Sequence, residues 1–200
     1  ARPVWAARHL LAARGYQEVV NFAFVEEAWE RDFCANENPI RLANPIASHL
    51  SVMRSSLIPG LVGTLAANRK RQIERVRVFE VARVFERKAD GEPVRGFHQV
   101  MNIAALAAGQ VVPEQWGERA RNVDFYDVKG DLEALFAPRE LQFTPLSHPA
   151  LHPGRAAAVR LDGHMIGVLG ELHPVWVQRY ELGSAPVVFE VALDAALADR

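Results

Sequence analysis

The sequence predicts an α+β fold, a mostly antiparallel sheet flanked by helices, with all 200 residues in a single domain. Segments typical of strands are mostly joined by hairpin turns, and helical segments with one apolar face lie between them. Half of the residues are hydrophobic and 24% are charged, which is the composition of a globular protein. A chain of this length can bury roughly 70% of its unfolded surface.

A helix over residues 2–14 and a strand over residues 16–25 are predicted first. Pro3 suits the first turn of a helix, where its missing N–H costs little. The residues that share one apolar face of this helix are Val4, Ala7, Leu10 and Leu11. The next segment, YQEVVNFAFV, has the β-branched and aromatic content of a strand.

A second helix is predicted from Ser56, as its N-cap, to about Arg71. Leucines spaced four residues apart give it an apolar stripe, and the cations of NRKRQ complement the dipole at its C-terminus. Two strands follow. RVRVFEVARVF alternates, so that Val76, Val78 and Glu80 share one face, and MNIAALAAG is apolar enough to be covered on both faces.

The remaining elements are marked by local signals. Asp124 is the expected N-cap of a helix over FYDVKGDLEALF, in which Gly130 costs up to ~1 kcal/mol relative to alanine. The pair Asp162-Gly163 predicts a primed turn between the two strands of a hairpin. Pro174 begins a short helix, VVFEVAL is the last strand, and DAALADR begins a final helix.

Charge, cysteine content and hydropathy narrow the class of protein. A formal net charge of −1 gives no whole-chain field that attracts nucleic acid, so an RNA contact would need a local patch. The single cysteine, Cys34, cannot form an internal disulfide, which fits a reducing compartment, and no adjacent base activates it. No segment has the ~20 apolar residues of a membrane span and no leader opens the chain, so a cytoplasmic location is expected.

Five segments resemble, in order and spacing, the bacterial phenylalanine–tRNA ligase beta subunit. They are NPIASHLSVMRSSLIPGLVGTLAANRKRQ, RVRVFEVARVF, VDFYDVKGDLEALF, LHPGRAAAVRLDGHMIGVLGELHP and VVFEVAL. The resemblance covers nearly the whole chain and implies the central, catalytic-like domain of that subunit, with a class II synthetase fold that has lost its chemistry. The tRNA-binding-like, editing, DNA-binding-like and anticodon-binding modules of the family have no counterpart, which implies a piece excised from a longer subunit.

The resemblance also implies partners. Alpha and beta subunits of this family form an (αβ)2 heterotetramer, in which the alpha subunit carries the working active site with ATP and Mg²⁺, and tRNA(Phe) is bound by the complex. No cofactor is expected on this domain itself. The helix over residues 2–14 is placed like the motif 1 helix of class II synthetases, so its apolar face is the expected subunit interface: Val4, Ala7, Leu10 and Leu11.

The same resemblance indicates where catalytic residues are missing. Class II adenylation needs an arginine of motif 2 and a glycine-rich motif 3 that ends in an arginine, because charge on the α-phosphate must be neutralised. At the motif 3 position, VVFEVALDAAL offers Glu190 and Asp194 instead. Arg83 remains near motif 2 as a surface or interface residue. Arg54 occupies a substrate-side position, where we expect it to bond carbonyls or a carboxylate such as Glu80.

The histidines and glycines between residues 148 and 174 are typical of a loop that binds a metal or a nucleotide. The other residues that such a site needs are missing from this segment. His148 and His152 are each followed by proline, which disfavours a helix that would bring both histidines onto one face. No Cys or acidic residue lies at a spacing typical of metal ligands, so no metal site is expected. Gly167 and Gly170 accompany no phosphate-loop lysine. We expect them, with His173, to be scaffold residues that let a helix or a partner chain approach the sheet closely.

Two alternative functions stay open. The first is an RNA-binding module whose salt-dependent phosphate contacts come from the basic run Arg69, Lys70, Arg71, Arg75 and Arg77. The same run is equally typical of a solvated helix end. The second is an adenylate-forming enzyme with altered motifs, which would need ATP in a shared pocket of arginines.

Overall fold

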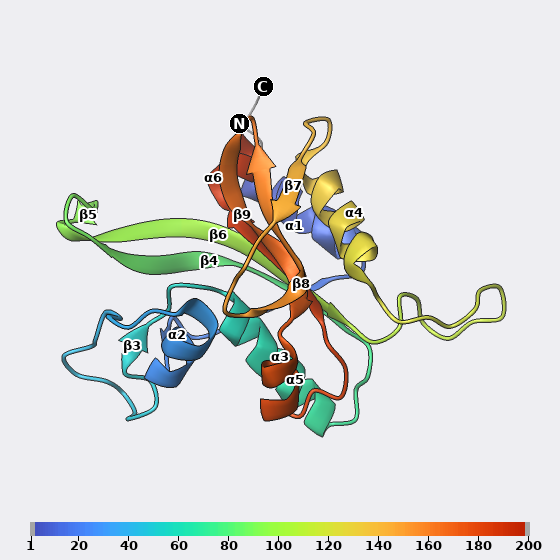
Figure 1. Ribbon diagram of the computed structural model, residues 1–200, viewed down its shortest axis with the longest axis horizontal. Helices are drawn as coiled ribbons and strands as arrows, with labels where there is room; N and C mark the ends of the chain where they lie inside the picture. Colours follow the sequence, from blue (N-terminus) through green and yellow to red (C-terminus); the bar gives the residue numbers. More distant parts are fainter. Residues whose placement is uncertain (1–2, 199–200) are drawn as a thin grey trace.

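The structure is a computed structural model that describes residues 3–198, and it has one large sheet between two groups of helices (Figure 1). Five long strands form the centre of the sheet: β4 (Val76–Lys88), β6 (Gly96–Ala108), β10 (Val187–Ala192), β9 (His164–Leu172) and β8 (Leu151–Leu161). Its edges are the short strands β1 (Gln17–Glu18) and β7 (Gln142–Pro145), while β5 (Pro93–Val94) pairs with β6. Strands β2 (Phe24–Val25) and β3 (Val52–Met53) form a separate pair.

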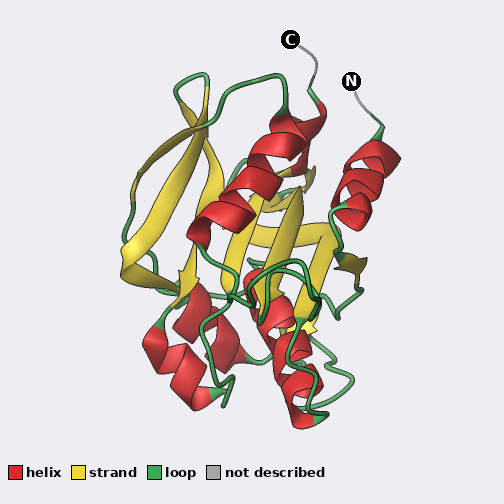
Figure 2. Ribbon diagram, turned by 90° about the vertical axis from the view of Figure 1, so that its right-hand side faces the viewer, coloured by secondary structure: helices red, strands yellow, loops and turns green. Residues whose placement is uncertain are grey.

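The strand order is β1-β4-β6-β10-β9-β8-β7, and every neighbouring pair is antiparallel except β1 with β4. This confirms the predicted α+β class with a mostly antiparallel sheet. Helices α1 (Val4–Ala13), α4 (Phe125–Phe136) and α6 (Leu193–Leu197) cover one face. Helices α2 (Glu27–Cys34), α3 (Ile58–Lys70) and α5 (Pro174–Arg179) cover the other, so the two groups lie at opposite ends of the view in Figures 1 and 2.

Each face of the sheet has its own apolar core, because successive residues of a strand point to opposite sides. Phe79 and Phe189 belong to the core under α1 and α4, whereas Val78 and Val188 belong to the core under α3. The alternation predicted for RVRVFEVARVF is therefore confirmed. Residues 103–108 of β6 are buried throughout, as expected for a strand covered on both faces.

Several local signals also give the predicted structure. The Asp124 side chain accepts from the N–H groups of Tyr126 and Asp127 in a capping box at the start of α4. Asp162 and Gly163 have φ values of 50° and 80°, as a primed turn requires. Among residues 3–198, no helix combines the length and the apolar character needed to cross a membrane.

Three expectations about the N-terminal third are wrong or incomplete. Residues 16–25 do not form one strand, because the chain leaves the sheet edge soon after Val19 bonds the Phe79 carbonyl and continues to the separate β2–β3 pair. Leu57, not Ser56, is the N-cap of α3. Helix α2 was not predicted. The expected helix start at Arg2 and the last residues of DAALADR lie outside the described residues.

Candidate functional site

Two buried glutamates lie near the middle of the sheet on the face that α3 covers. Glu80 of β4 and Glu190 of β10 both pair with Ala104 of β6, so the three residues lie side by side. Neighbouring strands are about 4.8 Å apart, which places the two glutamates about 10 Å apart with a methyl group between them. Their exposures are 1% and 7%, so both carboxyl groups are removed from solvent.

The segment of residues 54–56 bonds to these two glutamates and to a third glutamate, Glu30. Arg54 binds Glu80, with 2.8 Å between Nη1 and Oε1. The Ser55 N–H donates to Oε1 of Glu30, a fully buried residue of α2, at 2.9 Å. The Ser56 hydroxyl donates to Glu190. This three-glutamate cluster (Glu30, Glu80 and Glu190) therefore fastens the start of α3 to α2, β4 and β10.

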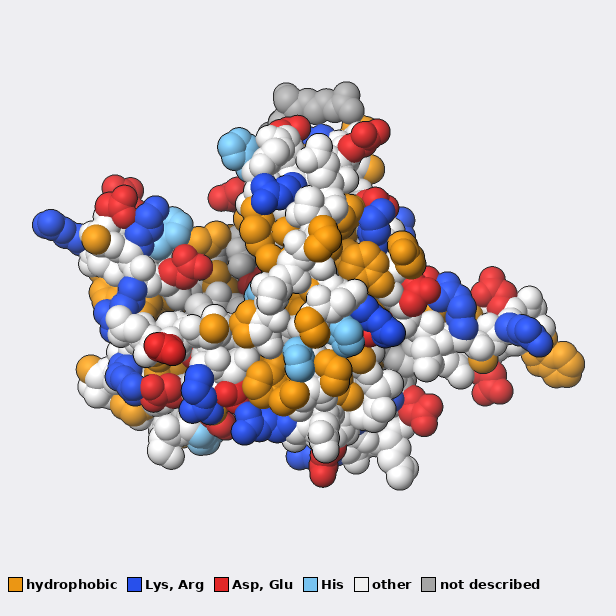
Figure 3. All heavy atoms as spheres, viewed as in Figure 1, with side chains coloured by type: hydrophobic (Ala, Val, Ile, Leu, Met, Phe, Trp, Pro, Cys, Tyr) orange, Lys and Arg blue, Asp and Glu red, His pale blue; other side chains and the backbone are white. Residues whose placement is uncertain are grey.

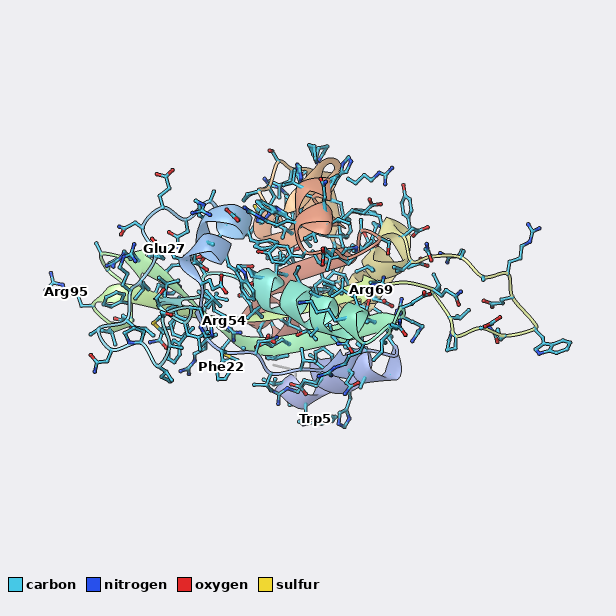
Figure 4. The ribbon with its side chains drawn as sticks, turned by 90° about the horizontal axis from the view of Figure 1, so that it is seen from below. Trp5, Phe22, Glu27, Arg54, Arg69 and Arg95 are labelled. Atoms are coloured by element: carbon cyan, nitrogen blue, oxygen red, sulfur yellow. The ribbon has the colours of Figure 1, made fainter. Side chains whose placement is uncertain are left out.

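The Arg54–Glu80 pair is almost completely buried, with 5% and 2% of the two side chains exposed. Arg54 Nε also donates to the Arg83 carbonyl at 3.1 Å, and Asn21 Nδ2 donates to the second Glu80 oxygen at 2.8 Å. These are the carbonyl and carboxylate contacts predicted for Arg54. Figure 4 shows Arg54 beside the start of α3, with Phe22 nearby. The side chain of Arg83 is exposed, so its backbone alone takes part in these bonds.

The carboxylate of Glu190 lies at the N-terminus of α3. It accepts from the Leu57 N–H at 3.1 Å, from Asn102 Nδ2 at 2.7 Å and from the Ser56 hydroxyl. Burial raises the pKa of Glu190, while these three donors and the charge of Arg54 act to lower it. A helix N-terminus is a favourable position for an anion. Here the chain's own side chain fills that position, whereas Asp194 is exposed in the first turn of α6.

A cavity of about 320 Å³ adjoins Glu190. Its polar lining includes Glu86, Asn102, His148, Ser55 and Ser56. No arginine or lysine of the described chain lines it. Cys34 also lines it, and burial raises the pKa of its thiol, which keeps the sulfur protonated. A second cavity, of about 450 Å³, is lined in part by Arg54 and mainly by apolar side chains such as Phe22 and Trp29.

The three His-Pro pairs between residues 148 and 174 make the same local hydrogen bond. Nδ1 of His148, His152 and His173 accepts the N–H two residues ahead, at 3.2, 3.0 and 3.1 Å. Because the intervening proline has no N–H, the imidazole takes the next available donor; at His173 this caps α5. Within residues 3–198, no three His, Cys, Asp or Glu side chains are grouped so that they could hold a metal ion.

Glycine is required at positions 167 and 170 of β9, because the backbones of the neighbouring strands leave no room for a Cβ. A Cβ added at Gly167 would lie 2.1 Å from the Glu190 carbonyl oxygen, and one at Gly170 would lie 2.7 Å from the Arg155 carbonyl oxygen. The expectation that a helix or a partner chain approaches these positions is therefore corrected, since β10 and β8 of the same sheet do so. Gly167 keeps β9 close to the strand that carries Glu190.

The basic run is not assembled into one face. Arg69 donates to the Ser184 hydroxyl at 3.2 Å, and Arg75 donates to the Val111 carbonyl at 3.1 Å. The side chain of Arg77 is 9% exposed and lies over the Tyr16 ring, 3.6 Å from Asp131. Lys70 and Arg71 are the exposed members of the run. Arg69 lies toward the opposite end of α3 from Arg54 (Figure 4).

The apolar face of α1 packs on the chain's own core. Ala7 and Leu11 are buried there, and Val4 and Leu10 are partly buried against the same cluster. The exposed face of α1 instead carries Trp5, 60% exposed, whose ring contacts His9 edge-on. That Val4, Ala7, Leu10 and Leu11 also contact another subunit stays a prediction.

Comparison with known proteins gives consistent matches. The family described as "Phenylalanyl tRNA synthetase beta chain CLM domain" matches residues 3–193. The chain is 74% identical over 196 residues to the phenylalanine–tRNA ligase beta subunit of Aromatoleum aromaticum, and 60% identical over 200 residues to that of Dechloromonas aromatica. Each match covers 98% of this chain and 25% of the relative, so the chain spans about a quarter of their length.

The fold is also similar to that of solved structures. One of them is PylSc, a pyrrolysyl tRNA synthetase from Desulfitobacterium hafniense, with a TM-score of 0.66 and 14% sequence identity. The match covers 98% of this chain and 66% of PylSc.

Proposed function

The chain belongs to the phenylalanyl-tRNA synthetase beta-chain family, and from this we propose that it forms the non-catalytic core of a beta subunit. In this proposal the domain packs on the alpha subunit of a cytoplasmic (αβ)2 heterotetramer and supports the ATP-dependent charging of tRNA(Phe) with phenylalanine. ATP and Mg²⁺ are bound by the alpha subunit.

The observation that carries the proposal is the position of Glu190 at the N-terminus of α3. Adenylate formation requires preorganised donors and cations around the phosphate. Here the N–H of Leu57 and the hydroxyl of Ser56 already bind a carboxylate. The guanidinium of Arg54 is likewise neutralised by Glu80. These groups bind one another within the chain, which supports a structural role for this part of the sheet.

The proposal is tested by ATP–pyrophosphate exchange with phenylalanine. The chain alone is expected to give the rate of a buffer blank, and the reconstituted alpha–beta complex to give full exchange. Calorimetric titration of the chain with ATP and Mg²⁺ is expected to give no binding heat. Exchange by the chain well above the blank would overturn the proposal in favour of an adenylate-forming enzyme.

A matched variant tests the same point inside the complex. Glu190→Gln keeps the shape of the side chain and an oxygen that accepts from Leu57 and Asn102. If this part of the sheet takes no part in chemistry, the complex carrying the variant retains exchange within about twofold of the unchanged complex. A tenfold loss, with the complex still assembled, would contradict the structural role.

A further inference from the structure

The segment between β6 and α4, residues 110–122, projects from the rest of the domain; we call it the arm (Figures 1 and 3). Trp116 lies near its middle and is fully exposed, with a relative accessibility of 107%. A Cβ added at the adjacent Gly117 would meet nothing within 4 Å. Tryptophan is enriched among the residues that dominate binding at protein interfaces, which makes this position a candidate contact point.

The base of the arm is held by backbone hydrogen bonds. The Val123 N–H donates to the Gly109 carbonyl at 2.8 Å, and the Val111 N–H donates to the Arg121 carbonyl at 3.0 Å. Gly109 has a φ of +82°, and a Cβ there would lie 2.3 Å from the Glu74 carbonyl oxygen, so a residue with a side chain does not fit this turn. The arm therefore leaves the sheet in a fixed direction.

Side chains add to this attachment. Arg121 binds both carboxylate oxygens of Asp127, at 2.6 and 2.7 Å, and Asp127 is part of the capping box of α4. On the other side, Arg75 donates to the Val111 carbonyl. The arm thus combines a fixed base with an exposed aromatic residue, and such preorganisation lowers the entropy lost on binding.

The charge of the outer arm favours a protein over RNA. Arg121 is neutralised by Asp127, which leaves Glu114, Glu118 and Arg119 on residues 112–120, a formal charge of −1. Nucleic-acid binding relies on cations that neutralise phosphates, so this segment is not suited to RNA. The acidic residues Glu114 and Glu118, on either side of Trp116 in the sequence, instead complement an apolar pocket that has basic residues at its rim.

The area that Trp116 can bury is small, which indicates a partner that another interface already holds against this domain. An aromatic side chain buries about 150–250 Å². A stable interface buries about 800 Å² on each partner, so the arm by itself cannot hold a free protein. It suits a chain that a larger interface already holds against this domain.

Resting on the proposed function, which supplies such a chain, we propose that Trp116 inserts into an apolar, basic-rimmed pocket of the alpha subunit. The test uses the full-length beta subunit with its alpha subunit and compares Trp116→Ala with Tyr126→Ala, an exposed aromatic of α4 at 76%. Trp116→Ala is expected to raise the alpha–beta dissociation constant about 30-fold, the loss of one hot-spot side chain. Tyr126→Ala is expected to change it less than twofold. Equal dissociation constants for Trp116→Ala and unchanged protein would overturn the proposal.

A second measurement identifies what covers the ring. In beta subunit labelled with 5-fluorotryptophan, the resonance of Trp116 is assigned by its loss in Trp116→Phe. It is expected to be accessible to a soluble paramagnetic agent in the beta subunit alone and protected after the alpha subunit is added. Protection in the beta subunit alone, or only after tRNA is added, would refute the alpha subunit as partner. If the complex assembles and exchanges pyrophosphate while Trp116 stays accessible, the arm proposal fails and the proposed function stands.

Discussion

Removal of Glu80 is expected to destabilise the domain strongly, because it leaves a buried guanidinium without its counter-ion. Arg54 is 5% exposed on its side chain and binds Glu80 at 2.8 Å, and Asn21 donates to the same carboxylate twice. Removing one partner of a buried ion pair lowers the free energy of unfolding by about 3–5 kcal/mol, which is a large part of the 5–15 kcal/mol typical of a domain. Glu80→Met should therefore lower the folding equilibrium constant at least about a hundredfold.

The assay is a double-mutant cycle followed by urea denaturation and circular dichroism. Arg54→Met alone is expected to cost about as much as Glu80→Met, whereas the double variant should recover at least about 2 kcal/mol relative to the sum, because no unpaired charge remains. Equal m-values among the four proteins are the control for a common unfolding transition. Additive effects, or a cost of Glu80→Met below about 1 kcal/mol, would show that water reaches the pair and would refute the reasoning.

The other predictions concern single positions. Burial raises the pKa of Glu190 above its ordinary value of 4.5, so this group's contribution to stability is complete below that value and is lost as pH rises through the raised pKa. Urea titrations should therefore show Glu190→Gln gaining in unfolding free energy relative to unchanged protein from about pH 5 to pH 8; a constant difference would contradict the raised pKa. Gly167→Ala should lower the unfolding free energy by about 1–3 kcal/mol or more, while Gly130→Ala, where a Cβ meets nothing within 4 Å, should raise it by up to about 1 kcal/mol. Thermal unfolding checks both, and an unaffected Gly167→Ala would mean that β9 and β10 separate readily. His173→Ala should cost about 1 kcal/mol through the lost cap of α5, and His173→Asn should restore it. Amide exchange at Val175 reports on this bond, and equal protection in both variants would rule out the cap.

Features that depend on neighbouring residues could be predicted from the sequence. The capping box at Asp124 and the primed turn at Asp162-Gly163 involve atoms within three residues, and strand alternation placed Glu80 on the face of Val76 and Val78. Such features depend only on residues that are close in the chain, so they can be predicted from a single sequence.

The partners of the buried glutamates could not be predicted in this way. Ser56 and Asn102 reach Glu190 across 134 and 88 residues. The pairing of β6 with β10 brings Asn102 to Glu190, whereas the packing of α3 against β10 brings Ser56 there. The buried position of Glu30 depends on α2, for which the spacing of four between Trp29 and Phe33 is the local helical signal in the sequence. The strand expected over residues 16–25 failed for a similar reason, since bonds from Asn21 to a distant glutamate draw the chain off the sheet edge.

The interlocked bonds at Arg54, Ser55 and Ser56 also constrain how such a domain can change over generations. Glu80 is safe to replace only if its buried partner Arg54 is replaced at the same time, and point mutations rarely arrive in pairs. A lineage can thus retain this buried ion pair for stability alone, because each single replacement leaves the other charge unpaired in the interior. Polar residues deep in a fold are, by themselves, a poor record of catalysis.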